Sequence, residues 1–241
     1  PVNHASVQRE PVAAKGELLL DARGVVKSFS GLRALDGVDV QVRAGEILGL
    51  VGPNGSGKST FINVVSGHYR ADGGSLRFGG TELRHLAPHR ISRAGVSRTY
   101  QIPRPFARMT VAENVALAAM FGHASLDRVA AHAEAQRWLA FTQLDLKADA
   151  FPDDLNLHQR KFLELARALA SQPALLFLDE VLSGLTPTEI DDAIRLVRSI
   201  RDQGATIVFV EHVMRAVMEL TDRVVVLNHG KVIAEGLPAE V

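Results

Sequence analysis

The feature that most constrains this sequence is an apolar run at residues 48–51, followed directly by the pattern GxxxxGK[ST] at residues 52–59. A buried strand of this kind leads into a tight loop, whose glycines let backbone N–H groups turn inward around a phosphate. Lys58 can then reach the β- and γ-phosphates, the Ser59 hydroxyl can ligate Mg²⁺, and a helix starting near Lys58 adds the positive end of its dipole. We therefore predict that a nucleoside triphosphate binds to the loop formed by Gly52, Pro53, Asn54, Gly55, Ser56, Gly57, Lys58, Ser59 and Thr60.

Length and charge narrow the class of protein further. At 241 residues, the chain can form one large domain, or a domain and a sub-domain. Its 27 basic and 27 acidic residues leave no net charge, which argues against nucleic acid as a partner, because binding to a phosphate backbone normally requires a basic surplus. There are no cysteines, and no apolar run or leader predicts a transmembrane helix or a signal peptide. Because the chain starts at Pro1 without a methionine, we expect an excised part of a longer protein.

The order of the predicted elements indicates an α/β fold with a parallel sheet. Residues 38–42 alternate as a half-buried antiparallel strand, residues 47–51 read as a buried parallel strand, and residues 76–78 as an edge hairpin. Further strands are predicted at residues 97–101, 175–178, 206–210, 223–227 and 231–234, and helices at 111–120, 129–144, 159–171 and from Thr186 to Gly204. The last helix opens with the spacing of a capping box at residues 186–189, with Pro187 at its first position. We expect a flexible lead at 1–16, a nucleotide-binding core at 17–110 and 172–241, and a helical sub-domain at 111–171.

Two carboxylates after another buried strand help to decide between classes of P-loop protein. The four apolar residues 175–178 are followed by Asp179 and Glu180. The strand presents Asp179 beside the phosphate loop, where it can hold Mg²⁺ through water, and places Glu180 to orient or deprotonate an attacking water. An acidic turn after a strand is common by itself, but this one follows a P-loop. The sequence therefore predicts a site of triphosphate hydrolysis.

With these motifs, residues 18–241 resemble an ATP-binding-cassette (ABC) ATPase. Residues 27–35 resemble the opening segment of the ATP-binding subunit of branched-chain amino-acid importers. The resemblance implies a RecA-like P-loop NTPase core with an antiparallel β sub-domain and an α-helical insertion, and hydrolysis of ATP with Mg²⁺ coupled to transport. It also implies that Phe29 stacks on the adenine ring, which suits its flat apolar face. The residues alone favour an ordinary core position for Phe29.

Two polar residues complete the site that the resemblance implies. Gln101 ends the strand predicted at 97–101 and, by resemblance, contacts Mg²⁺ and the attacking water and links the core to the helical insertion. His212 follows the strand predicted at 206–210 and, by resemblance, hydrogen-bonds the γ-phosphate with its imidazole. A polar loop residue and a polar cap of a strand are the alternatives for these two positions.

The chain departs from the family at the signature LSGGQ, which supplies a hydroxyl, backbone N–H groups and a helix N-terminus to the γ-phosphate held by the other subunit. Residues 155–159 read Leu-Asn-Leu-His-Gln instead. By resemblance, Asn156, His158 and Gln159 bind that nucleotide, and Asn156 could donate through its amide. Leu157 and His158 carry side chains where glycines allow a close approach of the backbone, so we expect a looser contact.

The resemblance also implies partners: transmembrane permease subunits, a second ABC ATPase subunit and, indirectly, a periplasmic or extracellular solute-binding protein. It places the chain at the cytoplasmic face of the inner membrane. The second ATPase subunit is either another copy of this chain, in a homodimer, or a related chain, in a heterodimer. The altered signature suggests the heterodimer, in which the site that this signature completes is the weaker one. Residues 103–106 and Met109 predict either a loop packed on the helical insertion or a groove for a short permease helix. Alternatives are the ATPase of a lipopolysaccharide-type ABC exporter, a soluble non-transport ABC ATPase, and a non-cassette P-loop kinase.

Overall fold

The computed structural model describes residues 12–241, so residues 1–11 of the predicted flexible lead lie outside the described residues. A six-stranded sheet has the order β10-β9-β3-β8-β7-β6, in which β10 is antiparallel to β9 and the other pairs are parallel. Its strands are β3 (Ile47–Val51), β6 (Val96–Arg98), β7 (Leu175–Asp179), β8 (Thr206–Val210), β9 (Arg223–Asn228) and β10 (Lys231–Gly236). The predicted parallel sheet is confirmed.

The second sheet is antiparallel and has the order β2-β1-β4-β5. It consists of β1 (Leu18–Phe29), β2 (Leu32–Arg43), β4 (Gly73–Phe78) and β5 (Thr81–Glu82). The alternation predicted at residues 38–42 is confirmed, because Val38, Val40 and Val42 are buried. The hairpin predicted around residues 76–78 lies at the edge of this sheet as β4 and β5.

Seven α-helices lie within residues 12–241: α1 (Lys58–Val65), α2 (Pro88–Ala94), α3 (Val111–Phe121), α4 (Arg128–Phe141), α5 (Leu157–Ala170), α6 (Pro187–Asp202) and α7 (Met214–Leu220). Short 3₁₀ turns at Asp145–Lys147 and Pro152–Asp154 connect α4 to α5. The capping box predicted at Thr186 is confirmed, with Pro187 as the first residue of α6. The helix predicted from Gln159 begins at Leu157 instead, because Asn156 is its N-cap. None of the helices in residues 12–241 is both long and apolar enough to cross a membrane.

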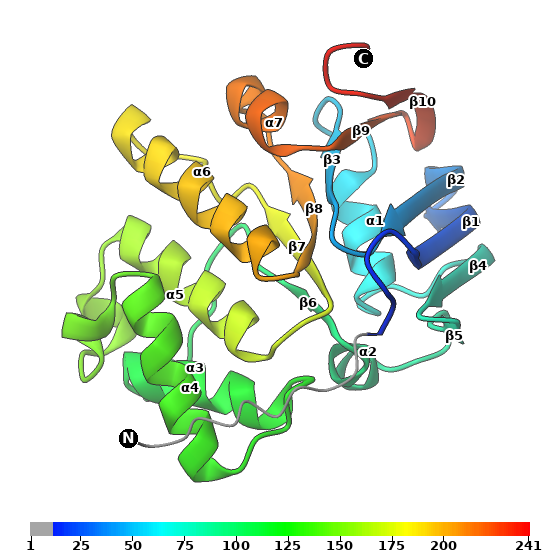
Figure 1. The fold of residues 1–241 in the computed structure, drawn as a ribbon. Helices are drawn as coiled ribbons and strands as arrows, with labels where there is room; N and C mark the ends of the chain where they lie inside the picture. The colour runs from blue at the N-terminus through cyan, green and yellow to red at the C-terminus, as the bar shows by residue number, and fades with distance from the viewer. Residues whose placement is uncertain (1–11) are drawn as a thin grey trace.

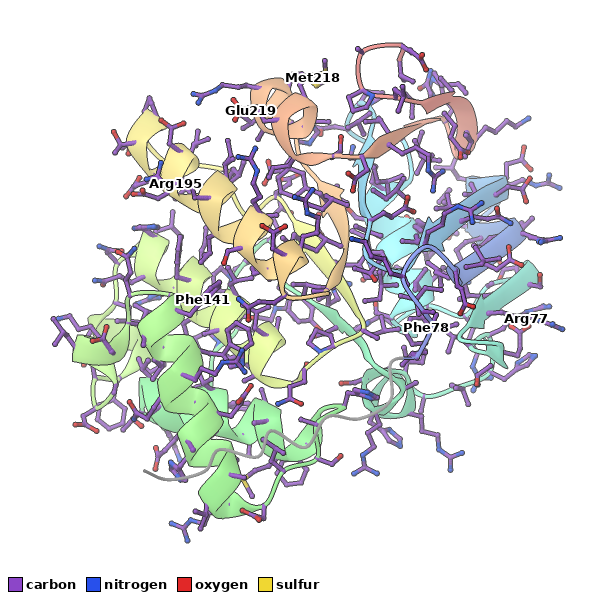
Figure 2. All side chains as sticks on the ribbon, in the orientation of Figure 1. Arg77, Phe78, Phe141, Arg195, Met218 and Glu219 are labelled. Atoms are coloured by element: carbon purple, nitrogen blue, oxygen red, sulfur yellow. The ribbon has the colours of Figure 1, made fainter. Side chains whose placement is uncertain are left out.

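The parallel sheet separates two hydrophobic cores. In Figure 1, α1 lies between this sheet and the antiparallel sheet at the right, whereas α3, α4 and α5 form a group at the lower left. Side chains on alternating positions of β7 enter different cores: Leu176 and Leu178 pack with the helices, and Leu175 and Phe177 pack towards the antiparallel sheet. Charged side chains such as Arg195 and Glu219 lie on α6 and α7 at the outer surface (Figure 2).

Candidate functional site

The predicted phosphate loop connects β3 to α1 and lies against neighbouring backbone. Gly57 is the N-cap of α1 with φ 113°, and a Cβ atom there would lie 2.7 Å from the carbonyl oxygen of Ala34. A Cβ atom on Gly52 would lie 2.1 Å from the carbonyl oxygen of Leu227. Glycine is therefore required at both positions. The loop borders a cavity of about 140 Å³ lined by Ala34, Asn54, Gly55, Ser56, Gly57, Lys58, Ser59, Thr60 and Glu180.

Lys58 lies at the start of α1 and folds back over the loop. Its Nζ donates hydrogen bonds to the carbonyl oxygens of Gly52, at 2.7 Å, and Pro53, at 3.0 Å. Burial lowers the pKa of Lys58, and the negative charges of Glu180 and Asp179 oppose this shift. The ammonium group is thus held by the loop that the sequence predicts to enclose a phosphate.

The three predicted catalytic residues meet at the ends of neighbouring strands. One carboxylate oxygen of Glu180 accepts a hydrogen bond from Gln101 Nε2 at 2.5 Å, and the other lies 3.1 Å from His212 Nε2. Because β6, β7 and β8 are adjacent and parallel, the segments that follow them emerge at the same edge of the sheet. Gln101 itself lies beyond β6, which ends at Arg98, and not at the end of the strand as predicted.

Glu180 also has an unusual backbone. Its φ of 50° lies in the left-handed region, which is rare for a residue with a side chain. The N–H of Glu180 donates to the carbonyl oxygen of Val210 at 2.9 Å. The surrounding contacts therefore hold a strained residue whose carboxylate borders the phosphate-loop cavity.

Asp179 is the buried carboxylate of the pair. Burial raises its pKa, and the Arg98 guanidinium, with Nη2 at 3.5 Å from Asp179 Oδ2, lowers it. Asp179, Ser59 and Gln101 offer carboxylate, hydroxyl and amide oxygens, which suit a hard cation such as Mg²⁺. Residues 12–241 contain no group of three or more His, Cys, Asp or Glu arranged to hold a metal ion by themselves. This donor set fits Mg²⁺, which typically takes its remaining ligands from phosphate and water.

The signature residues lie at the start of α5 and do not line the phosphate-loop cavity of their own chain. Asn156 and Gln159 form a reciprocal capping box, in which Gln159 N–H donates to Asn156 Oδ1 at 2.9 Å. His158 Nδ1 lies 3.2 Å from a carboxylate oxygen of Glu189 in α6, and its ring packs edge-on against Phe162. The role of these residues towards a nucleotide stays a prediction.

Phe29 ends β1 and is 39% exposed, so the ordinary core position favoured by the residues alone is wrong. Its ring packs edge-on against Tyr69, with centroids 5.0 Å apart. An exposed aromatic pair is available for stacking, but adenine binding by Phe29 stays a prediction. Tyr69 lies outside the residues predicted from the sequence to bind the nucleotide.

Two buried charged residues that the sequence analysis missed hold the turn after Glu180. Glu211 accepts hydrogen bonds from the N–H groups of Leu182, at 2.7 Å, and His212, at 3.3 Å. Burial raises the pKa of Glu211 to about 7. Lys161 in α5 donates to the carbonyl oxygens of Ser183 and Glu180. Glu211 could have been noticed as a charge directly after the apolar run 206–210, whereas Lys161 follows Arg160 in a polar stretch and gives no such signal.

A phosphate loop on this two-sheet fold, with Glu180 between Gln101 and His212, defines an ATP-binding cassette. The family model for ABC transporters matches residues 35–183, which is more than half of the chain. The chain belongs to the ABC transporter family, and it is an ATP-binding and ATP-hydrolysing transporter subunit.

Known relatives and a solved structure agree with this assignment. The chain is 38% identical to the probable branched-chain amino acid transport ATP-binding protein LivG of Archaeoglobus fulgidus, over 90% of this chain and 89% of the relative. It is also 38% identical to the ribose import ATP-binding protein RbsA of Pseudomonas putida, over 91% of this chain but 43% of that protein. A nucleotide-free ATP-binding cassette from an ABC transporter superposes with a TM-score of 0.81 at 30% identity, over 92% of both chains.

Proposed function

We propose that the chain drives an importer of branched-chain or other hydrophobic amino acids from the cytoplasmic face of the plasma membrane. Its role as the hydrolysing subunit is supported by the position of the Glu180 carboxylate, which lies between Gln101 and His212 beside the phosphate loop. The solute class is supported by the similarity to LivG, which covers nearly the full length of both chains. RbsA is equally identical but more than twice as long, so its ribose specificity is a weaker guide.

In this proposal, each side chain of the site has a distinct task. Lys58 exchanges its bonds to the loop carbonyls for bonds to the β- and γ-phosphates, while the N-terminus of α1 faces the same charge. Glu180 accepts a hydrogen bond from the attacking water and orients it towards the γ-phosphate, with general-base assistance. Gln101 keeps the carboxylate in place. His212 Nε2 exchanges its contact with Glu180 for a hydrogen bond donated to the γ-phosphate when ATP binds.

Mg²⁺ would be held by the Ser59 hydroxyl, with Asp179 contacting it through water and Gln101 supplying an amide oxygen. When bound, the ion neutralises charge on the phosphates during the transfer. The burial of Asp179 keeps this carboxylate in one position, so that the site is organised before the nucleotide arrives.

We further propose that a second ATPase subunit completes each site. Asn156, His158 and Gln159 lie apart from the cavity of their own chain, as expected for residues that act on a nucleotide held by a partner. The His158 side chain, paired with Glu189, stands where a glycine would leave the backbone open to the nucleotide. This supports a looser contact between the signature and the nucleotide held by the partner subunit. Because the hydrolytic residues are present while the signature is altered, we infer a heterodimer in which the other chain supplies a stronger signature.

A groove between the core and the helical sub-domain is the proposed docking site for a short helix of a permease subunit. It has a volume of about 440 Å³ and is lined by Phe106, Leu117, Phe121 and the polar residues Arg98, Tyr100 and Arg167, among others. Phe106 and Phe121 are about half exposed, and they offer the apolar contact that an amphipathic helix needs. Phe106 belongs to the loop after Gln101, for which the sequence allowed two interpretations: packing on the helical insertion or docking of a permease helix.

The proposal is tested in a transporter assembled from this chain, its permease subunits and its solute-binding protein. Leucine, isoleucine or valine should stimulate ATP hydrolysis, whereas ribose should not; stimulation by ribose alone would contradict the solute class. Glu180→Gln should keep ATP binding and abolish steady-state hydrolysis, and Lys58→Ala should weaken ATP binding itself. Normal turnover with Glu180→Gln would contradict the assignment of that carboxylate.

A further inference from the structure

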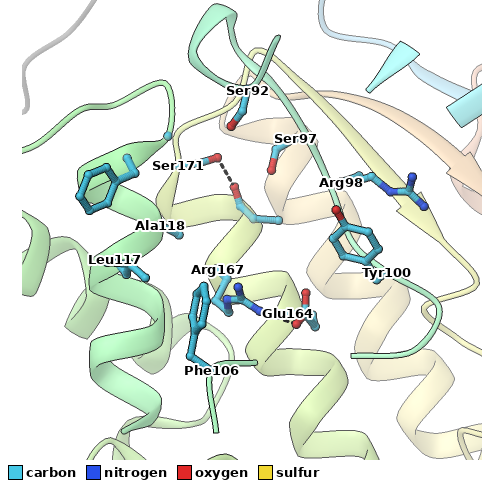
Figure 3. A pocket seen from close by; sticks show the side chains of 13 residues that line it. Ser92, Ser97, Arg98, Tyr100, Phe106, Leu117, Ala118, Glu164, Arg167 and Ser171 are labelled. Carbon is cyan, nitrogen blue, oxygen red and sulfur yellow. Dashed lines mark hydrogen bonds and ion pairs between the residues drawn. The ribbon is translucent and has the colours of Figure 1, made fainter. Parts of the chain in front are cut away.

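Arg98 lies between the docking groove and the Asp179 carboxylate. Its side chain is only 10% exposed, and Nη2 is 3.5 Å from Asp179 Oδ2. The same residue lines the groove together with Tyr100. In Figure 3, Arg98 and Tyr100 are seen on one side of the groove, and Leu117 and Ala118 on the other. The side chain of Arg98 therefore connects the docking groove to the carboxylate of Asp179.

The guanidinium also contacts the helix that follows the phosphate loop. Its Nη1 donates to Asn63 Oδ1 in α1 at 2.6 Å, while Nη2 faces Asp179. Arginine can satisfy both directions because its donors form a rigid planar fork, whereas lysine presents a single compact ammonium group. Arg98 thus fixes the Asp179 carboxylate relative to α1, the helix that carries Lys58 and Ser59.

On the side that faces the groove, Arg98 contacts the ring of Tyr100. The guanidinium carbon lies 4.6 Å from the centre of the Tyr100 ring, within the range of a cation–π contact. The Tyr100 hydroxyl lies 3.2 Å from His68 Nε2, which fixes the far edge of the ring. A segment seated in the groove would contact Tyr100, and a shift of this ring would change its contact with the guanidinium.

We propose that Arg98 is a positioning residue that orients the Asp179 carboxylate for Mg²⁺ and makes this orientation depend on what occupies the groove. The first half rests on the contacts of Arg98 with Asp179 and Asn63. The second half rests on the proposed function, because it needs a permease helix in the groove. Binding of a permease helix in the groove would then change the orientation of Asp179 at the nucleotide site through the side chain of Arg98.

The first half is tested on the 241-residue chain alone. Binding of a fluorescent ATP analogue is followed as Mg²⁺ is varied, so the measurement does not depend on hydrolysis. Outer partners of a metal ligand typically contribute about 10–100-fold in affinity, and Asp179 acts through water, so Arg98→Met should raise the half-saturating Mg²⁺ concentration about tenfold, near the lower end of that range, and Arg98→Lys by a smaller factor. Arg195→Met, which removes an exposed Arg–Asp pair on α6, is the matched control and should leave it unchanged.

Circular dichroism establishes which Arg98 variants fold. If Arg98→Met does not fold, Arg98→Lys decides the question. A half-saturating Mg²⁺ concentration within about twofold of wild type, in every Arg98 variant that folds, would overturn the positioning role.

The second half is tested by repeating the Mg²⁺ series on the chain assembled with its permease subunits. Assembly should shift the half-saturating Mg²⁺ concentration of the wild-type chain by more than about twofold, and this shift should be lost in the Arg98 variants. A complex that forms but leaves the wild-type value unchanged would overturn the link to the groove. Failure to assemble would contradict both this link and the proposed function, while the result on the isolated chain would stand.

Discussion

The buried carboxyl of Glu211 should make the stability of the fold fall as the pH rises. Its pKa is about 7 in the folded chain and near 4.5 when unfolded, so the folded chain binds more protons between these two values. The free energy of unfolding therefore decreases from about pH 4.5 to about pH 7 and then no longer depends on Glu211. At about 1.4 kcal/mol per pH unit, the full decrease is roughly 3 kcal/mol.

The physical cause is burial, and the groups around Glu211 act in both directions. The N–H groups of Leu182 and His212 and the positive charge of Lys161 favour the ionised carboxylate, while the negative charge of Glu180 and the loss of water disfavour it. Glu211→Gln keeps an oxygen that can accept the Leu182 N–H but cannot ionise. The variant should therefore match wild type at about pH 4 and below, and become more stable than wild type by up to roughly 3 kcal/mol at pH 8.

Denaturant unfolding of both chains between pH 5 and pH 8 measures this difference, and taking the difference cancels the titration of all other groups. Glu219→Gln, on the exposed side of α7, is the control and should run parallel to wild type within about 1 kcal/mol. If the wild-type and Glu211→Gln curves keep a constant separation over this range, the carboxyl of Glu211 titrates normally and the reasoning from burial is wrong.

Two further predictions concern the phosphate loop and the signature. Gly57→Ala should lower the affinity for ATP at least about tenfold, because its Cβ would overlap the carbonyl oxygen of Ala34, whereas Gly55→Ala has open space and should cost only about 1–2 kcal/mol of stability through its positive φ. Equal ATP affinities of the two variants would contradict this. Replacing residues 156–158 together (Asn156→Ser, Leu157→Gly and His158→Gly) should raise ATP turnover of the assembled transporter on the order of tenfold, about 1.4 kcal/mol. An unchanged rate would show that the native signature already gives full contact.

The sequence predicted those parts of the fold that local signals specify. Continuous apolar runs identified β3, β7 and β8, and the capping box at Thr186 with Pro187 located the start of α6. The same runs placed Asp179, Glu180 and His212 at one edge of the sheet, because parallel strands end together. Asp179 and Glu180 were therefore accessible from strand order and residue type, whereas the roles of His212 and Gln101 came from the resemblance to the ABC family.

Other elements gave weaker local signals. Strand β1 was missed because its pairing with β2 shifts register several times and passes through Gly24 at φ 58°, which breaks the alternation of buried and exposed residues. Helices α2 and α7 have seven residues each, too few for a clear helical period.

Contacts between segments that are distant in the chain also could not be predicted from the sequence. Arg98 meets Asp179, and Lys161 meets the carbonyl oxygens after β7, only once the strands and α5 have packed together. No local pattern encodes such contacts, because Arg98 and Lys161 look like ordinary charged residues in their own segments.

The alternation of β7 between the two hydrophobic cores has a practical consequence for spectroscopy. Leu176 and Leu178 have methyl groups in the core on the side of the helices, and Leu175 has its methyl groups in the core shared with the antiparallel sheet. Methyl-labelled leucines at these positions would report separately on the two halves of the molecule, from a single strand that ends at Asp179. Relaxation experiments on these methyl groups could then show whether the two halves move together or independently when nucleotide binds.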